Sequence, residues 1–322
     1  MKYNIINENK ALDYPCNYLN KIIFKNSIGD NGNNLTIVVL SLNRSNLTIK
    51  LINSIDKYLE NFQGELLIID NNSKNEEKNV VKKRLEKCKV RNRFIELDKN
   101  YGVAGGRNKA IQYVNTDWLL NLDNDIYFIN NPIKKINDAL CTMGCHFMNL
   151  PLLDESGKRI FANGGALYVS YRQNDFYIGG GSFYEQGEKN IEKDFENSLS
   201  NFLFGGASII NKQTFINCGM FDDNMFIGFE DTDFSLRLYN LGYKIGSVGT
   251  FCLIHNHVID EKNLDIDYEK IRFSSDIIRQ SGLYFENKNG LKVLDENVEL
   301  WLEQRQKRIR NFSNKKSKKN RL

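Results

Sequence analysis

The chain has 322 residues, and 41% of them are hydrophobic, which is enough for one large α/β domain with appendages. Its 20 Phe and 15 Tyr argue against a disordered chain. A net charge of +4 is too small to indicate nucleic-acid binding, so we expect no nucleic-acid partner. The charge is uneven, because the segment from Arg305 onward contains nine Lys or Arg and no acidic residue.

Six Cys residues occur without a C-x-x-C pair, which gives little support to a zinc or thioredoxin-like site. Reduced thiols of this kind are typical of a cytoplasmic protein. The segment Met1–Lys10 is mostly polar and lacks the apolar run of a signal peptide. No stretch approaches the ~18 apolar residues of a transmembrane helix. We therefore expect a cytoplasmic location, with at most a peripheral contact at the inner face of the cell membrane.

The first half of the chain alternates between apolar runs and helical patterns. Residues 1–33 form a predicted N-terminal extension that ends in a turn-rich linker. Leu35–Leu40 and Glu65–Asp70 are typical of strands buried on both faces. Two more strands are predicted over residues 93–97 and 117–122, and helices over 47–59, 75–88 and 105–114. This order predicts an α/β fold with a mostly parallel sheet flanked by helices, and ligands that bind beyond the carboxyl ends of its strands.

The second half is less regular. Residues 143–200 contain short Gly- and Tyr-rich segments that indicate irregular strands and loops. Apolar spacing predicts a helix over 231–241 and a strand over 246–254, followed by C-terminal helices over 265–285 and 291–311. The predicted division is a domain over 34–260, with a nucleotide-binding half (34–130) and an acceptor and catalytic half (131–260), followed by helices with a basic tail (261–322).

An acidic triplet, Asp123-Asn124-Asp125, follows the fourth predicted strand. Its two carboxylates can reach a common hard cation, and Mg²⁺ or Mn²⁺ would bridge them to phosphate oxygens. A solvated turn is the alternative for the triplet taken alone. His255 follows a later strand, where it is either a nitrogen ligand of the same metal or a structural histidine.

A glycine-rich segment, Asn100–Asn108, opens the third helix. Its glycines allow close backbone approach, and a helix N-terminus favours anions. Arg107 adds a charge-assisted partner for a phosphate or a base edge, unless the segment is a plain turn with Arg107 in solvent. The pattern is not G-x-G-x-x-G, and the chain has no P-loop. Both absences argue against a Rossmann oxidoreductase and a P-loop kinase.

Two further acidic sites, a single aspartate and a cluster of three acids, have both a functional and a structural interpretation. Asp70 closes a buried strand, where its carboxylate accepts from a uracil or ribose donor or caps the next turn. Glu230, Asp231 and Asp233 open a helix, where the dipole favours acids. The functional interpretation is that one of them is a general base, which takes the proton of an acceptor hydroxyl as its oxygen attacks an anomeric carbon.

Six segments carry a resemblance through their shared order, and they are Ile37–Arg44, Ile68–Ser73, Asn100–Asn108, Leu122–Asp125, Gly205–Ser208 and Phe229–Arg237. Over roughly residues 34–258 they resemble the inverting family 2 glycosyltransferases with the GT-A fold, a Rossmann-like α/β fold. The pattern is close to that of bacterial rhamnosyltransferase-like members. The N-terminal extension and the C-terminal helices lie outside the resemblance.

The resemblance implies roles for residues of the nucleotide-binding half. Ser41, Asn43 and Asp70 would line the nucleoside site. Arg107 would lie near the base or the diphosphate, and Asp123 would contact the ribose or the metal. The first strand of the family usually ends in a Pro-Thr-Tyr-Asn pattern, and this chain has Ser41-Leu42-Asn43 instead.

The resemblance also implies roles for the metal and the chemistry. Asp125 would be the direct metal ligand, and His255 would match a metal-ligand histidine that occurs in some members. Gly205-Gly206 would lie beneath the donor sugar or the acceptor. Asp231 would be the general base, with Glu230 beside it.

The implied activity is the inverting, metal-dependent transfer of a sugar from a UDP- or dTDP-sugar to a glycan or polyprenyl-linked acceptor, with Mn²⁺ or Mg²⁺. One alternative is a sugar nucleotidyltransferase, which needs a glycine-rich basic loop after the first strand that Ser41–Arg44 lacks. A second is a non-catalytic carbohydrate-binding relative, which would have lost the Asp123 and Asp125 pair or Asp231. For the apolar stripe over residues 291–302, the alternatives are a helix on an anionic membrane and a helix packed on the core.

Overall fold

The structure is a computed structural model that describes residues 10–11, 22, 24, 27–183, 194–256 and 266–319. Most of the predicted N-terminal extension lies outside the described residues, and so does His257, the neighbour of the candidate ligand His255. The last residues of the basic tail, 320–322, lie outside them as well.

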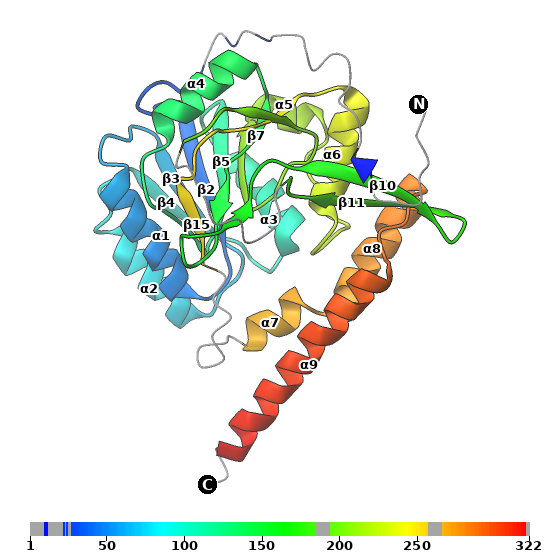
Figure 1. Ribbon diagram of the computed structural model, residues 1–322. Helices are drawn as coiled ribbons and strands as arrows, with labels where there is room; N and C mark the ends of the chain where they lie inside the picture. The colour runs from blue at the N-terminus through cyan, green and yellow to red at the C-terminus, as the bar shows by residue number, and fades with distance from the viewer. Residues whose placement is uncertain are drawn as a thin grey trace.

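An eight-stranded sheet forms the centre of the molecule, in the order β12-β14-β7-β13-β5-β2-β3-β4 (Figure 1). Four neighbouring strands are parallel, namely β5 (Trp118–Asp123), β2 (Leu35–Ser41), β3 (Glu65–Asp70) and β4 (Asn92–Glu96). The helices that connect them are α1 (Ser45–Tyr58), α2 (Asn75–Leu85) and α3 (Gly102–Ala110), the last followed by the 3₁₀ turn η2 (Ile111–Tyr113). The predicted β-α alternation and the mostly parallel, helix-flanked sheet are confirmed.

Helices cover both faces of this sheet, which explains why its central strands β2 and β3 are largely apolar and buried on both faces. In β2, Ile37 and Val39 pack with α1, α2 and α4 (Ile133–Met143), whereas Val38 packs with α3 and α6 (Glu230–Leu241) on the other face. All three side chains are buried. Successive residues of a strand point to opposite faces, so each face receives half of the apolar run.

The other half of the sheet reverses direction. Strand β13 (Ala207–Asn211) is antiparallel to β5 and to β7 (Phe147–Asn149), and helix α5 (Lys212–Asn217) follows it. At the far edge, β14 (Ile245–Ser247) is parallel to β7 and antiparallel to β12 (Ser198–Ser200). This arrangement brings Gly206, the residue before β13, beside the end of β5.

Two smaller sheets flank the large one. The hairpin of β10 (Ala166–Arg172) and β11 (Asp175–Gly181) pairs with the short strand β1 (Lys10–Ala11). The other small sheet has the order β6-β15-β8-β9, with bounds Ile126–Phe128, Leu253–His255, Leu152–Leu153 and Ile160–Ala162. Together the two small sheets contain most of the strand residues described in the region predicted as irregular strands and loops.

The prediction of one continuous strand over residues 246–254 is wrong. Two short strands of different sheets, β14 and β15, occupy this segment. The chain turns at Gly249, where a Cβ atom would lie 2.0 Å from the Phe195 carbonyl oxygen. Any side chain at position 249 would clash with this oxygen, so the close approach requires glycine. The two strands separate at this residue.

The C-terminal helices differ in their bounds from those predicted. The helix predicted over 265–285 is two helices, α7 (Ile266–Arg272) and α8 (Ser275–Asn289), because the Ser274 hydroxyl caps α8 by accepting from the Ile277 N–H. The final helix, α9 (Glu296–Lys319), begins five residues later than predicted. The preceding residues run extended beside β11, where the Ile178 N–H donates to the Lys292 carbonyl at 2.8 Å.

The first turns of α9 pack on the domain, and its C-terminal half extends away from the body (Figure 1). Leu302 is fully buried, and the Trp301 ring meets the Phe273 ring edge-on with centroids 5.5 Å apart. These contacts favour the core-packed interpretation for this part of the apolar stripe. None of the helices in the described part of the chain combines the length and apolar content that a bilayer crossing requires.

Candidate active site

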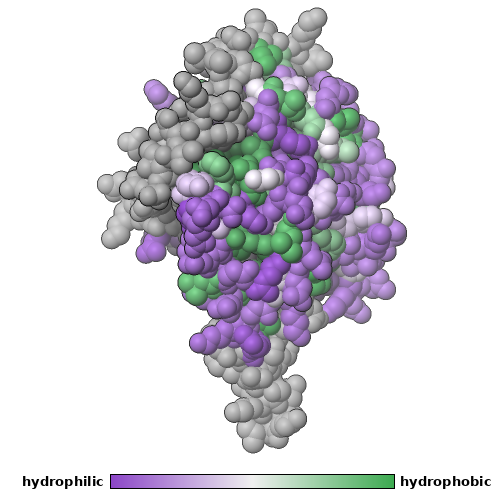
Figure 2. All heavy atoms as spheres, turned by 90° about the vertical axis from the view of Figure 1, so that its right-hand side faces the viewer, coloured by the Kyte–Doolittle hydropathy of each residue, from purple (hydrophilic) through white to green (hydrophobic). Residues whose placement is uncertain are grey.

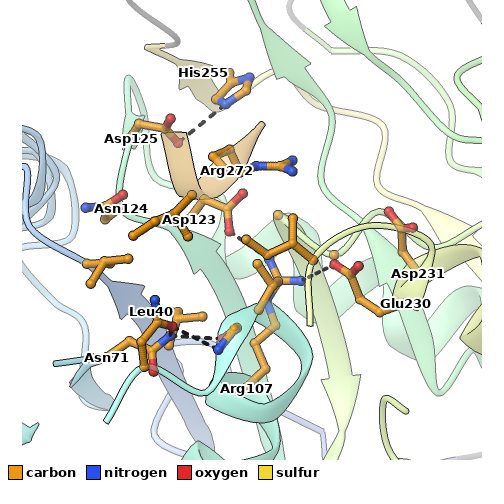
Figure 3. A pocket seen from close by; sticks show the side chains of 18 residues that line it. Leu40, Asn71, Arg107, Asp123, Asn124, Asp125, Glu230, Asp231, His255 and Arg272 are labelled. Atoms are coloured by element: carbon orange, nitrogen blue, oxygen red, sulfur yellow. Dashed lines mark hydrogen bonds and ion pairs between the residues drawn. The ribbon is translucent and has the colours of Figure 1, made fainter. Parts of the chain in front are cut away.

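The main pocket lies at the carboxyl ends of the parallel strands, where Leu40 of β2 stands opposite Asp123 of β5 (Figure 3). This is the edge at which α/β sheets bind their ligands. Eight of the residues singled out from the sequence line it, and they are Arg107, Asp123, Asp125, Gly205, Gly206, Glu230, Asp231 and His255.

Arg107 and Asp123 form an ion pair at the floor of the pocket. The Arg107 guanidinium donates to Asp123 Oδ1 at 2.7 Å, and Arg107 is only 4% exposed whereas Asp123 is 43% exposed. Gly205 and Gly206 cover this pair from the turn before β13. A Cβ atom on Gly205 would lie 2.3 Å from Arg107 Nη1, and one on Gly206 would lie 2.7 Å from Asp123 Oδ2. The two glycines are therefore needed for the backbone to approach the pair.

Glu230 and Asp231 begin helix α6 and face the same pocket (Figure 3). Glu230 is buried, its Oε1 atom lies 3.8 Å from Arg107 Nη1, and its Oε2 atom has no hydrogen-bond partner among the described residues. Asp231 is half-buried, and its Oδ1 atom accepts from the Thr232 N–H at 2.9 Å. Burial, and then the neighbouring Glu230 carboxylate, raise the pKa of Asp231 to about 7.

The third acid of this helix has a structural environment. Asp233 is fully buried, and its carboxylate pairs with Arg237 at 2.9 Å and with Lys288 at 2.8 Å. These partners come from α6 itself and from α8. Asp233 therefore joins the two helices, and the catalytic candidates are reduced to Glu230 and Asp231.

Asp125 and His255 form a second polar cluster across the pocket. Antiparallel pairing of β15 with β6 places His255 opposite Ile126, so that its Nε2 atom lies 3.4 Å from Asp125 Oδ1. Arg44 Nη2 contacts the other carboxylate oxygen at 3.1 Å. Burial lowers the pKa of His255, but the hydrogen bond and charge of Asp125 outweigh burial and raise that pKa above its usual value.

The Asp125–His255 pair has the donor chemistry of a divalent-cation site. A carboxylate and an imidazole, both on the pocket wall, suit Mn²⁺ and leave further positions for phosphate oxygens. Asp123, the third predicted ligand, is held by Arg107 instead. Within the described ranges, no group of three His, Cys, Asp or Glu is arranged to hold a metal. The residues present therefore fit a metal that completes its coordination with a ligand.

Three residues expected in the nucleoside site lie beside the pocket and do not line it. The Ser41 hydroxyl bonds the Thr48 hydroxyl at 3.1 Å, and both are buried. Asp70 Oδ1 accepts from the Ser73 N–H at 2.9 Å, which is the turn-capping arrangement. Asn43 accepts from the Lys74 N–H at 2.9 Å. Leu40, Leu42 and Asn71, the neighbours of these residues, line the pocket.

The glycine-rich segment forms a turn that Asn71 organises. Asn71 donates to the Asn100 side chain and to the Gly102 carbonyl, both at 2.9 Å, and accepts from the Tyr101 N–H at 2.9 Å. Helix α3 begins at Gly102, three residues before the predicted start. Gly102 has φ +73°, and a Cβ atom there would lie 2.2 Å from the Phe226 carbonyl oxygen. The turn therefore requires glycine, and it directs Arg107 into the pocket.

One charged pocket residue was not anticipated from the sequence. Arg272, the last residue of α7, projects into the pocket with Ile271 beside it (Figure 3). It adds a second cation to a pocket that already holds Arg107. No motif marks Arg272, and only the basic character of the last turn of α7 distinguishes it.

The fold and the site together define a GT-A-type domain, in which a parallel half-sheet binds its ligand beside an acidic triplet. Residues 36–148 match the family model described as Glycosyl transferase family 2. Over this segment the chain is similar to glycosyl transferase family 2, and its sheet has the GT-A arrangement, in agreement with the resemblance. No curated protein matches the chain.

Solved structures have the same fold. A structure of GalNAc-T7 with UDP, GalNAc and Mn²⁺ is 16% identical, covers 69% of this chain and has a TM-score of 0.53. TarS of S. aureus is 15% identical, covers 74% of this chain and has a TM-score of 0.50. A fragment of S. aureus TarS in complex with UDP is 14% identical and has a TM-score of 0.50. The matched region covers 87% of this chain and 70% of the TarS fragment. The chain spans only 42% of the GalNAc-T7 chain and 39% of the longer TarS chain.

Proposed function

We propose that the protein transfers a sugar from a nucleotide diphosphate sugar to a hydroxyl of a glycan or lipid-linked acceptor, in a metal-dependent reaction that inverts the anomeric carbon. One observation supports this function above the others. A single pocket at the carboxyl edge of the sheet combines two arginines, a carboxylate–imidazole pair, and the buried Glu230 and half-buried Asp231 at a helix start. These are the groups needed for a diphosphate, a divalent cation and a general base.

Asp125 and His255 would hold the metal, and Asp123 would bind the ribose or join the metal shell once a nucleotide displaces Arg107 from it. When bound, a divalent cation neutralises charge on the leaving diphosphate. Arg107 and Arg272 supply further positive charge in the same pocket. Positive groups of this kind stabilise the diphosphate more strongly as negative charge develops on it.

Asp231 is the base of this proposal. Its Oδ1 atom is occupied by the Thr232 N–H, so Oδ2 takes the proton of the acceptor hydroxyl. The acceptor oxygen forms the new bond to the anomeric carbon, and the bond from that carbon to the diphosphate oxygen breaks. Glu230 is held near Arg107, and its Oε2 atom is buried without a hydrogen-bond partner among the described residues. A sugar hydroxyl would satisfy that atom.

The test of the proposed function is calorimetric titration of the full chain with UDP and dTDP, in Mn²⁺, in Mg²⁺ and in EDTA. We expect one of the nucleotides to bind, with a higher affinity in the presence of the metal. A panel of the corresponding nucleotide sugars then identifies the donor through release of the nucleoside diphosphate. Equal nucleotide affinity in Mn²⁺ and in EDTA contradicts metal dependence, and no binding of either nucleotide contradicts the function as a whole.

Arg272→Gln is expected to weaken UDP binding about 10- to 100-fold, because a hydrogen bond to a charged group contributes about 1.5–3 kcal/mol. Uridine, which lacks the diphosphate, should bind the variant as well as it binds the unmodified chain. Arg272→Lys should recover part of the UDP affinity, since it restores the charge but not the planar guanidinium.

Arg305→Gln is the matched control for Arg272. Both guanidinium groups lie over the Phe273 ring, at 5.5 Å for Arg272 and 4.8 Å for Arg305, but only Arg272 lines the pocket. Arg305→Gln should therefore leave UDP affinity unchanged. Equal losses in the two variants, or a loss that uridine shares, would indicate that Arg272 only supports the packing of α7.

A further inference from the structure

A second hollow, the hairpin groove, lies between the β10–β11 hairpin and the segment that leads into α9. The hairpin contributes Tyr168, Arg172, Tyr177 and Gly179, and Asp295 is on the opposite wall. Figure 2 views the molecule from the side on which the hairpin and α8 lie, and polar and apolar residues are interspersed there. The groove thus belongs to a mixed surface and not to a continuous apolar face.

The hairpin groove is connected to the active-site pocket through shared residues. Arg272 lines both the pocket and a small hollow beside Trp301. Phe229 and Val298 line both that hollow and the hairpin groove. The three hollows are therefore neighbours that share walls, in an order that runs from the candidate general base to the hairpin.

The first turn of α6 separates the two ends of this series of hollows. Glu230 and Asp231 face the active-site pocket, while Phe229 and Thr232 line the hairpin groove. Consecutive residues at the start of α6 thus line the two different hollows. An acceptor that presents a hydroxyl to Asp231 would therefore reach the groove by passing Phe229.

The side chains of the groove match the chemistry of a saccharide. Arg172 forms an ion pair with Asp295, and its guanidinium lies 4.3 Å from the centre of the Tyr177 ring. Sugar rings offer hydroxyls to charged groups and C–H faces to aromatic rings, and tyrosine has both an apolar body and a polar end. A polyprenyl chain offers no hydrogen bonds, so it would leave Arg172 and Asp295 desolvated at a cost of free energy.

Gly179 keeps the groove open. It lines the groove on β11, and a Cβ atom added there would meet no atom within 4 Å. The next residue differs, because a Cβ atom on Gly180 would lie 1.9 Å from the Phe202 ring. A large side chain at position 179 therefore fills the groove without a clash with the core, whereas the same change at position 180 disrupts the packing.

We propose that the hairpin groove binds the saccharide chain of the acceptor, so that the acceptor is an oligosaccharide whose terminal hydroxyl lies at Asp231. The rest of that chain passes Phe229 and reaches the aromatic and charged wall of the hairpin. This assignment rests on the proposed function, and it selects a glycan over a lipid as the part of the acceptor that the enzyme recognises.

The experiment compares the full chain with its Gly179→Trp and Gln112→Trp variants on a printed array of defined oligosaccharides and monosaccharides. Gln112 is exposed on η2 and lines none of the three hollows, so it controls for the added indole. We expect the unmodified chain to bind oligosaccharides in preference to monosaccharides. Gly179→Trp should weaken that binding about tenfold or more, and Gln112→Trp should not. Tyr177→Ala should also weaken it, because it removes a ring that lines the groove and holds the Arg172 guanidinium.

UDP titration of the same samples separates this proposal from the proposed function. All variants should bind UDP in Mn²⁺ as the unmodified chain does, and failure of that chain to bind any nucleotide would instead contradict the glycosyltransferase function. Three results overturn the saccharide groove: no oligosaccharide binding by the unmodified chain, binding that Gly179→Trp leaves intact, or binding to polyprenyl phosphate vesicles that Gly179→Trp abolishes while the array remains negative.

Discussion

Asp231→Asn is expected to reduce sugar transfer by about 10²- to 10⁴-fold, the usual contribution of a general base. The substitution keeps the shape of the side chain, and the amide oxygen can still accept from the Thr232 N–H as Asp231 Oδ1 does. The substitution replaces Oδ2, the oxygen that takes the proton, with an amide group that cannot act as a base. Nucleotide binding should remain within about twofold, because Asp231 contributes to the acceptor side of the reaction. Steady-state transfer and calorimetry with UDP measure the two effects separately.

The pH dependence of transfer follows from the raised pKa of Asp231. The base acts only when it is ionised, and burial together with Glu230 raises its pKa to about 7. The rate at low substrate should therefore rise with pH through about 7 and level off above it. The residual activity of Asp231→Asn should lack this rise. A rate that does not change between pH 6 and pH 8 would contradict the assignment of this base.

Stability distinguishes a lost base from a damaged fold. An aspartate whose folded pKa lies above its unfolded value of 3.8 favours the fold while it is protonated. That contribution is complete below pH 3.8 and is lost as pH rises through about 7. Asp231→Asn should therefore unfold at a higher denaturant concentration than the unmodified chain above pH 7. Near-normal transfer by this variant, together with a large loss in Glu230→Gln, would assign the base to Glu230.

The parallel half of the fold was predictable because its signals are local. An apolar run such as Leu35–Leu40 fits a strand buried on both faces, and the predicted strands alternate with helical patterns. Parallel strands align their carboxyl ends, so the position of Asp123 at the pocket follows from its place after a strand. The same reasoning does not specify side-chain direction. Ser41 and Asp70 lie at this edge, but their oxygens bond Thr48 and the Ser73 backbone.

The second half depends on contacts between distant segments, which no local pattern encodes. His255 meets Asp125 only because β15 pairs with β6, and β15 was predicted as part of one longer strand. The break at Gly249 is required by the approach of the Phe195 backbone. Arg272 reaches the pocket from α7, so the C-terminal helices complete a site that the family resemblance confined to residues 34–258.

The second large expected effect is the loss of metal-dependent UDP binding when Asp125, a buried residue, is replaced. Asp125→Asn is expected to abolish the gain in UDP affinity that Mn²⁺ provides, with a loss in Mn²⁺ affinity of about 100-fold or more. Even groups that only support a metal ligand change metal affinity about 10- to 100-fold. Asp125 is 6% exposed and its Oδ1 atom lies 3.4 Å from His255 Nε2, so the substitution removes one of the two residues proposed to hold the cation. Calorimetry with UDP in Mn²⁺ and in EDTA measures the effect.

A purely structural role for Asp125 makes a different prediction, because its carboxylate also separates Arg44 from His255. Removal of one partner of a buried ion pair is strongly destabilising. If Asp125 only holds this pair, Arg44→Gln and Asp125→Asn should lower stability alike and leave metal dependence intact. If Asp125 and His255 bind the metal, His255→Gln should share the loss of the Mn²⁺ effect. Arg44→Gln should then retain or increase that effect, since it removes a positive charge beside the cation.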